Sequence, residues 1–355
     1  MTAFFSSRLK HMKPYVPGEQ PRDQQYVKLN TNESPFPPSQ GVLDAVNGEA
    51  GKMNLYSDPE LLIARQRLAR RYGVGVENVL LTNGSDEALH FIILSYGDDE
   101  TPFVFPDVTY GLYPVLCRLY GLPFAEIPLR DDFTVDLAAF SKAKGHVILA
   151  NPNAPTGIAL TRDEIRDLAR GNPGRLVIVD EAYVDFGGES CIPLTRELPN
   201  LLVVQTYSKS RSLAGARLGF IIGPAALMAE INAVRCSINP YNVNRMSLAA
   251  AAAAIDDDGY YMANRRKIAE TRQWAKEQLA ALGFEVLPSS ANFLFAAPPD
   301  RDGEKYYLAL KKRGVLVRHF SIPRILPFVR ISIGAKEEMQ ILIRQTQAIL
   351  KEAQP

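Results

Sequence analysis

The segment around Lys209 has the residue types of a lysine that binds a phosphorylated aldehyde. Lys209 and the preceding Ser208 follow the short run 201–205, which predicts a buried strand. Arg217 comes soon after, among small residues. A lysine amine forms Schiff bases with carbonyl compounds, and serine and arginine side chains bind phosphate by charge-assisted hydrogen bonds. This motif alone leaves a second interpretation open, in which a strand runs into a polar loop.

A second motif places a carboxylate and a phenol after another expected strand. Residues 176–179 form an apolar run, Asp180 ends it and Tyr183 follows. Ligands of parallel sheets bind beyond the carboxyl ends of the strands, so Asp180 is expected to face a ligand crevice. A carboxylate there keeps the ring nitrogen of pyridoxal phosphate protonated, which makes the ring an electron sink. Tyr183 can reach the ring hydroxyl, whereas in the alternative interpretation Asp180 only caps a loop.

Two turns and a tyrosine complete the set of candidate residues. The turn 83–86, which contains Ser85 and Asp86, lies between an expected strand and an expected helix, where free backbone N–H groups bind phosphate. Alternatively, one of these side chains only caps the helix. The turn 151–157 is expected to be rigid and to follow a strand at the site; in the alternative interpretation it only connects two elements. Tyr110 can stack on a pyridine ring, although most tyrosines of such domains serve only packing.

The order of elements predicts two domains of different type. Strands and helices alternate up to residue 258, which indicates an α/β domain with helices on both faces of a mainly parallel sheet. A long charged helix, short strands and a terminal helix follow and predict a smaller α+β domain. The expected division is an N-terminal arm that packs with the small domain, a large cofactor-binding domain and a small domain, at residues 1–40, 41–258 and 259–355.

The expected elements follow from apolar runs, caps and turns. A helix is expected from Ser57, because Ser57 and Glu60 fit a capping box, and another is expected from Thr161 for the same reason. The strands are expected at residues 79–81, 103–105, 147–150, 176–179, 201–205, 293–295, 315–317 and 329–331. The other helices are expected from the turn 83–86 to about residue 96, from about residue 260 to 282 and from about residue 336.

Composition excludes several classes of function. The 355 residues include 40 basic and 39 acidic side chains, so no basic face for nucleic acid is expected. No apolar run approaches the ~20 residues that span a bilayer, and the apolar material before Arg8 is only Phe4 and Phe5, too little for a signal peptide. No membrane partner and a cytoplasmic location are therefore expected.

Cysteine and histidine usage supports this expectation and argues against a metal. Three scattered cysteines fit unpaired, buried thiols in a reducing compartment; they are Cys117, Cys191 and Cys236. The four histidines lack metal-ligand spacing; they are His11, His90, His146 and His319.

In this order, the motifs resemble those of the fold-type I pyridoxal-phosphate aminotransferases, and the resemblance covers essentially the whole chain. Further segments resemble the histidinol-phosphate aminotransferase branch; they are residues 14–19, 28–35, 56–59, 317–318 and 330–334. The resemblance implies a transaminase that acts on histidinol phosphate and 2-oxoglutarate in histidine biosynthesis, by ping-pong kinetics. Its cofactor would be pyridoxal 5'-phosphate.

The resemblance also implies a role for each matching residue. Lys209 would hold the cofactor covalently and move the proton of the substrate, while Asp180 would bind the ring nitrogen and Tyr183 the ring oxygen. Tyr56 would reach the cofactor phosphate of the neighbouring subunit, which implies a homodimer. The other implied cofactor contacts are Ser85, Asp86, Tyr110, Ser208 and Arg217. The implied substrate contacts are Tyr15, Arg318 and Arg330, and Arg330 matches the arginine that binds the substrate carboxylate.

One position departs from the family pattern, and related activities remain as alternatives. The family has asparagine, a donor to the cofactor ring oxygen, where this chain has Ala154. Either Tyr183 holds this oxygen alone or a neighbour compensates, since Asn153 is expected to point elsewhere. An aromatic aminotransferase or a phosphothreonine decarboxylase would share nearly all these residues. A non-enzymatic regulator that binds pyridoxal phosphate usually carries an added DNA-binding domain, for which the arm is too short.

Overall fold

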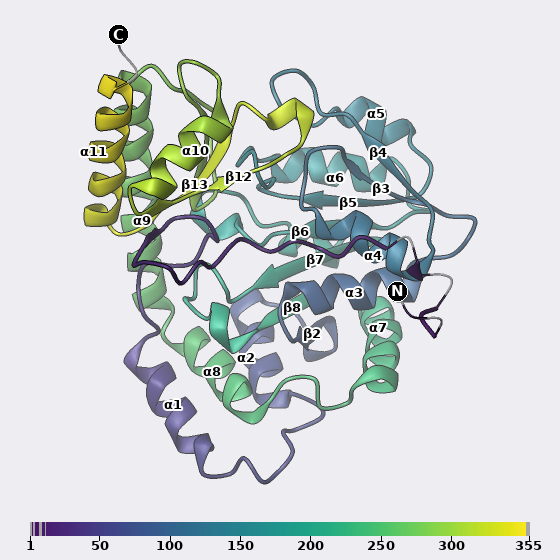
Figure 1. Ribbon diagram of the computed structural model, residues 1–355. Coiled ribbons are helices and arrows are strands. Elements are labelled where there is room, and N and C mark those ends of the chain that lie inside the picture. Colours follow the sequence, from purple (N-terminus) through teal and green to yellow (C-terminus); the bar gives the residue numbers. More distant parts are fainter. Residues whose placement is uncertain (1, 3, 7–8, 11, 353–355) are drawn as a thin grey trace.

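The computed structural model describes residues 2, 4–6, 9–10 and 12–352 (Figure 1). Arg8 and His11, named above, lie outside this part. A seven-stranded sheet has the order β2-β8-β7-β6-β5-β3-β4. Only β8 runs antiparallel to its neighbours, so the expected mainly parallel sheet is confirmed. The strands are β2 (Val79–Thr82), β3 (Phe103–Pro106), β4 (Phe124–Ile127), β5 (His146–Ala150), β6 (Val177–Asp180), β7 (Leu201–Thr206) and β8 (Gly219–Ile222).

Helices cover both faces of this sheet, which explains its continuous apolar strands. Successive residues of a strand point to opposite faces. Val177 and Val179 accordingly pack in one core, and Ile178 packs in the other. The first core includes side chains of α1 (Gln40–Ala50), α2 (Leu62–Tyr72), α5 (Leu137–Lys142), α6 (Arg162–Arg170) and α8 (Arg245–Asp256). The second includes side chains of α3 (Ser85–Tyr96), α4 (Leu112–Tyr120) and α7 (Ala225–Ile238).

A second sheet, of order β12-β13-β10-β9, is antiparallel and has its own core. The N-terminal strand β1 (Val27–Lys28) pairs with β11 (Val315–Leu316), and Leu29 enters the same core. The strands are β9 (Glu285–Val286), β10 (Phe293–Ala297), β12 (Arg318–His319) and β13 (Val329–Ser332). The helices that pack on them are α9 (Asp258–Ala281), α10 (Gly303–Lys312) and α11 (Lys336–Glu352). Short 3₁₀ helices are η2 (Val76–Asn78), η3 (Val184–Phe186), η4 (Ile192–Arg196), η5 (Ala214–Ala216) and η6 (Pro323–Ile325).

The capping box expected at Ser57 is wrong. Ser57 instead donates to the carbonyl of Val243, and α2 begins only at Leu62. Leu61 has a left-handed backbone with φ 53°, which interrupts the turn, and Asp58 accepts the N–H of Leu62. The capping box expected at Thr161 is confirmed, because Thr161 and Glu164 bond reciprocally at the start of α6.

Cysteine exposure differs in part from the expectation. All three thiols are free and two are buried, but Cys236 is exposed on α7. Within residues 2, 4–6, 9–10 and 12–352, no group of three or more His, Cys, Asp or Glu side chains is placed to hold a metal ion. None of the helices described is long and apolar enough to cross a membrane.

Candidate active site

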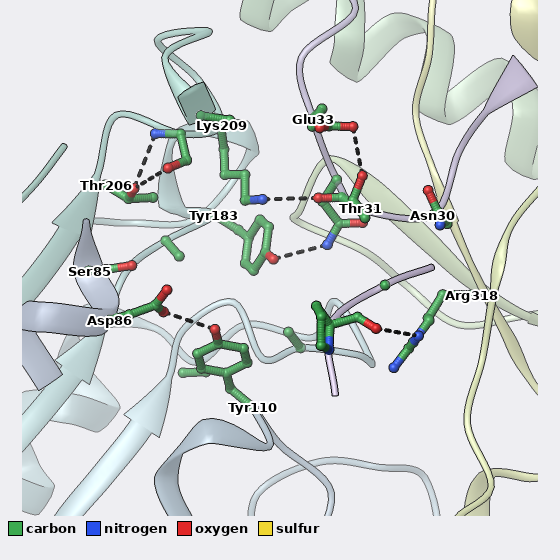
Figure 2. A pocket seen from close by; sticks show the side chains of 18 of the residues that line it. Asn30, Thr31, Glu33, Ser85, Asp86, Tyr110, Tyr183, Thr206, Lys209 and Arg318 are labelled. Atoms are coloured by element: carbon green, nitrogen blue, oxygen red, sulfur yellow. Dashed lines mark hydrogen bonds between the residues drawn. The ribbon is translucent and has the colours of Figure 1, made fainter. Parts of the chain in front are cut away.

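A cavity of about 390 Å³ lies where the predicted motifs converge (Figure 2). Ala150, Asp180 and Thr206 line it, and each ends a parallel strand of the large sheet. The opposite wall comes from the N-terminal segment 30–33 and from the second sheet. The cavity therefore occupies the crevice beyond the carboxyl ends of the strands, the usual ligand position in such folds.

Lys209 projects into this cavity from the turn after β7. Its Nζ donates to the backbone carbonyl of Thr31 at 3.1 Å and lies 6.0 Å from the ring centre of Tyr183 (Figure 2). Burial and, to a smaller extent, Arg330 lower the pKa of Lys209 from 10.5 to about 8, while Glu33 opposes the shift. More of this amine is therefore free base at neutral pH than in an ordinary lysine, as a nucleophile requires.

Asp180 is a buried carboxylate on the floor of the cavity. It accepts the Tyr113 hydroxyl at 2.9 Å and the backbone N–H of Ala182 at 3.2 Å. Burial raises the pKa of Asp180 to about 6, although both hydrogen bonds oppose the shift. The loop-capping contact of the alternative interpretation is present, and the carboxylate also lines the cavity. The two interpretations of Asp180 are therefore compatible.

The start of α3 forms an anion cradle. The residue before the helix is Gly84, whose lack of a side chain leaves the first N–H groups uncapped, so the alternative interpretation, a helix cap by Ser85 or Asp86, is wrong. A Cβ at Gly84 would lie 2.6 Å from a guanidinium nitrogen of Arg217, so only glycine allows this approach. Ser208 also lines the cavity. Helix N–H groups, hydroxyls and a guanidinium fit a phosphate group.

Asp86 contributes to this cradle indirectly through its side chain. Its carboxylate accepts the Tyr110 hydroxyl at 2.9 Å and Arg217 at 3.2 Å. A carboxylate is only an acceptor, so it cannot bind a phosphate oxygen directly. Asp86 therefore orients Arg217 and Tyr110, and only its backbone N–H is suited to a phosphate.

Two arginines line the opposite end of the cavity. Arg330 donates to the Asn30 carbonyl at 3.0 Å, and its buried Nε has no partner among the described residues. Arg318 donates to two carbonyls of the segment 16–17, both at 3.2 Å. Tyr15 packs edge-on against Tyr110, with ring centres 5.7 Å apart. This end can bind an anion and place it opposite Lys209.

Tyr56 is the one predicted site residue that lies away from this cavity. It is 76% exposed and stacks on Tyr241, with ring centres 4.4 Å apart. Neither tyrosine lines the cavity of its own chain. Tyr56 is therefore not placed to contact a ligand in the cavity of its own chain.

The turn 151–157 places no side-chain amide at position 154. Ala154 is buried and lines the cavity. The amide of Asn153 instead donates to the carbonyl of Val108 and to the Thr156 hydroxyl. Asn32, to which the sequence assigned no role, donates to the Tyr183 hydroxyl at 2.9 Å. Tyr113 was likewise missed, because nothing in its helical segment indicates a contact with Asp180.

A mainly parallel sheet with helices on both faces and a nucleophilic lysine at its carboxyl edge is the architecture of fold-type I pyridoxal-phosphate enzymes. The family model for aminotransferase class I and II matches residues 24–345, and the chain belongs to this family. It is 46% identical over 350 residues to histidinol-phosphate aminotransferase 1 of Bradyrhizobium diazoefficiens, covering 99% of this chain and 100% of the relative. It is 45% identical over 344 residues to histidinol-phosphate aminotransferase 1 of Methylococcus capsulatus, and this match covers 97% of this chain and 96% of the relative.

A solved structure has the same fold. The crystal structure of histidinol-phosphate aminotransferase from Sinorhizobium meliloti, in complex with pyridoxal-5'-phosphate, superposes with a TM-score of 0.88 at 26% identity. The match covers 97% of this chain and 96% of that chain. The predicted fold class and family are confirmed.

Proposed function

We propose that the chain is a pyridoxal-phosphate-dependent transaminase that moves an amino group between histidinol phosphate and 2-oxoglutarate in histidine biosynthesis. The observation that carries the proposal is the placement of Arg318 and Arg330 in one cavity with Lys209. Full-length similarity to two histidinol-phosphate aminotransferases supports this substrate pair.

The residues of the cavity match the chemical groups of the cofactor. The anion cradle at α3 suits its phosphate, and Asp180 suits its ring nitrogen. Tyr183 suits its ring oxygen, while the Tyr110 ring suits its flat face. When bound, pyridoxal phosphate supplies an electron sink for the negative charge that develops on the substrate. Asp180 favours this chemistry because its carboxylate stabilises a protonated ring nitrogen.

Lys209 is proposed to serve as the base that moves the substrate proton. A general base works best when its pKa lies near the operating pH. The pKa of Lys209, about 8, meets this condition because the side chain is desolvated near Arg330. The hydrogen bond to Thr31 holds the amine inside the cavity, which both residues line.

The arginine end suits both proposed substrates in turn. Glutamate carries an α-carboxylate, and histidinol phosphate carries a phosphate instead. A guanidinium fork binds either anion with paired hydrogen bonds. Arg330 is therefore proposed to bind both, with Arg318 at its side.

A homodimer, a domain division and a location complete the proposal. The exposed Tyr56 lies in a segment that also exposes Met53 and Leu55, which suits a subunit interface. We also propose the division into an arm, a large domain and a small domain at residues 1–40, 41–258 and 259–355, which the separate sheets support. The free cysteines support a cytoplasmic location.

Steady-state assays test the substrate assignment. The purified protein is incubated with histidinol phosphate, phosphothreonine or an aromatic amino acid, each with 2-oxoglutarate. Histidinol phosphate should give the highest kcat/KM and form glutamate. Release of carbon dioxide from phosphothreonine, or a preference for the aromatic substrate, would instead support one of the alternative enzymes. No turnover with any of them, despite bound cofactor, would favour a binding protein.

A further inference from the structure

Asn32 and Tyr183 both line the cavity and are hydrogen-bonded to each other. The amide Nδ2 of Asn32 donates to the Tyr183 hydroxyl at 2.9 Å, drawn as a dashed line in Figure 2. Asn32 is only 1% exposed, so the contact is shielded from water. The segment that carries Asn32 also provides the Thr31 carbonyl for Lys209. One short segment thus contacts two of the residues that define the cavity.

Ser332 determines which way the Asn32 amide points. The Ser332 hydroxyl accepts the backbone N–H of Asn32 at 2.8 Å, and a backbone N–H can only donate. The hydroxyl proton of Ser332 then goes to Oδ1 of Asn32, also at 2.8 Å. With Oδ1 bound as an acceptor, the NH₂ group must face Tyr183. This assignment of the amide gives a partner to the Ser332 hydroxyl and to both ends of the Asn32 side chain.

This contact directs the single proton of the Tyr183 hydroxyl. A phenol has one proton to donate, and here an NH₂ group occupies its acceptor side. The proton is therefore free to point into the cavity, which Tyr183 and Ala154 both line. Ala154 has only a methyl group and cannot act as a donor there. Tyr183 is the donor left at this part of the wall.

We propose that Asn32 is a positioning residue that aims the Tyr183 proton at the ring oxygen of the cofactor and so compensates for the missing amide at Ala154. The proposal rests on the proposed function, which places the cofactor ring oxygen at Tyr183. Asn32 has φ 54°, in the left-handed region that asparagine, aspartate and glycine tolerate best. Substitutions by aspartate and glycine therefore avoid added backbone strain.

The test compares two ligands of the full-length chain after its cofactor has been removed. One is pyridoxal phosphate, and the other is its 3-deoxy analogue, which lacks the ring oxygen. In Asn32→Asp the new carboxylate accepts the Tyr183 proton and turns it away from the ligand. Affinity for pyridoxal phosphate should fall about tenfold, as for the loss of one charge-assisted bond, while affinity for the analogue stays the same relative to wild type.

The ratio of the two affinities separates this role from a structural one. The added charge of Asn32→Asp also repels the ring oxygen, which only pyridoxal phosphate carries, so this variant alone does not separate charge repulsion from a turned Tyr183 proton. Asn32→Gly removes the donor without a charge and should change the ratio in the same direction. Asn292→Ala is the matched control, because Asn292 donates to the backbone carbonyl of Asn32 and, among the described residues, has no hydrogen bond to Tyr183. It should leave the ratio at the wild-type value.

Two results would overturn the inference. Equal losses for both ligands in Asn32→Asp and Asn32→Gly would show that Asn32 only supports the local fold. If both variants kept the wild-type affinities and the wild-type ratio between them, the Tyr183 proton would point at the ring oxygen without help from Asn32. Failure of the wild-type chain to bind pyridoxal phosphate at all is a different result, because it would remove the proposed function itself.

Discussion

The Nζ of Lys209 lies 3.1 Å from the backbone oxygen of Thr31, so the nucleophile of the large sheet is held by the N-terminal segment. The same segment pairs with β11 and enters the core of the second sheet. The two sheets and the N-terminal segment therefore build one cavity together. A change in the position of this segment would alter the site as directly as a change in the large sheet.

Lys209 should be the residue that binds the cofactor covalently. The purified protein is expected to be yellow, and borohydride should fix the label on the peptide that contains Lys209. Lys209→Ala should lose the absorption band, while Lys267→Ala serves as a control on α9. Mass spectrometry of the reduced protein checks the site of labelling. A label on Lys28 or Lys267 would contradict the assignment.

Arg330 and Arg318 should differ in their effects on the two substrates. Arg330→Ala should reduce kcat/KM for both glutamate and histidinol phosphate, whereas Arg318→Ala should affect histidinol phosphate more. Loss of a charge-assisted contact in a desolvated site corresponds to about 2–4 kcal/mol of transition-state binding. Arg344→Ala, at an exposed position of α11, is the control. Small and equal effects on both substrates would show that the two arginines are structural.

The proton on Asp180 should make the stability of the cofactor-free protein depend on pH. The folded protein keeps this proton up to about pH 6, while an unfolded chain releases it near 3.8. The folded state binds more protons in this window, so stability falls as the pH rises through it. Asp180→Asn should remove this loss of stability between about pH 4 and pH 6, because an amide does not titrate. The cofactor-free variant should melt a few degrees above wild type at pH 8 and at the same temperature below pH 4.

A control substitution and a measurement with bound pyridoxal phosphate complete the test of Asp180. Asp131→Asn changes an exposed carboxylate and should leave the melting curve unchanged at each pH. With pyridoxal phosphate present, the order should reverse, because Asp180→Asn lacks the charge that stabilises the protonated ring nitrogen. Equal melting temperatures of wild type and Asp180→Asn at pH 8 would show that burial of this carboxylate carries no penalty.

The sequence predicted the buried parallel strands because burial on both faces leaves a readable apolar run, as at Val177 and Ile178, but it missed the parallel edge strand β4, which is partly exposed. The sequence analysis also predicted no strand at residues 219–222, which form the antiparallel β8. A Cβ at Gly219 of β8 would lie 2.5 Å from the backbone nitrogen of Ser85, a proximity that no local pattern shows. The role of Asn32 was missed for a related reason. The orientation of the Asn32 amide depends on Ser332, which is distant in sequence.

Ala154→Asn should shift the titration of the yellow chromophore. An added amide beside Tyr183 supplies a second donor to the cofactor ring oxygen. A hydrogen bond to the charged oxygen stabilises the deprotonated form of the chromophore, so the colour change should move to lower pH. Absorbance spectra recorded against pH measure this shift. An unchanged titration would show that Asn32 and Tyr183 already satisfy the oxygen, or that the turn 151–157 lies too far away.

The last prediction concerns the sharing of one site between two subunits. Tyr56 is exposed and stacks on Tyr241 outside the cavity of its own chain, yet a tyrosine hydroxyl is well suited to a phosphate. Tyr56→Ala and Lys209→Ala homodimers should both be impaired, the first through weaker cofactor retention. Tyr56→Phe keeps the aromatic stack and should lose only the contribution of the hydroxyl.

Mixing the two impaired proteins then tests where Tyr56 acts. If Tyr56 serves the neighbouring subunit, a heterodimer has one site that lacks both groups and one site that has both. Activity should therefore return in part once the subunits have exchanged, which native mass spectrometry can verify. If Tyr56 served its own chain, each site of the heterodimer would lack one group. Confirmed exchange without recovery would thus exclude a shared site and remove the main support for the proposed homodimer.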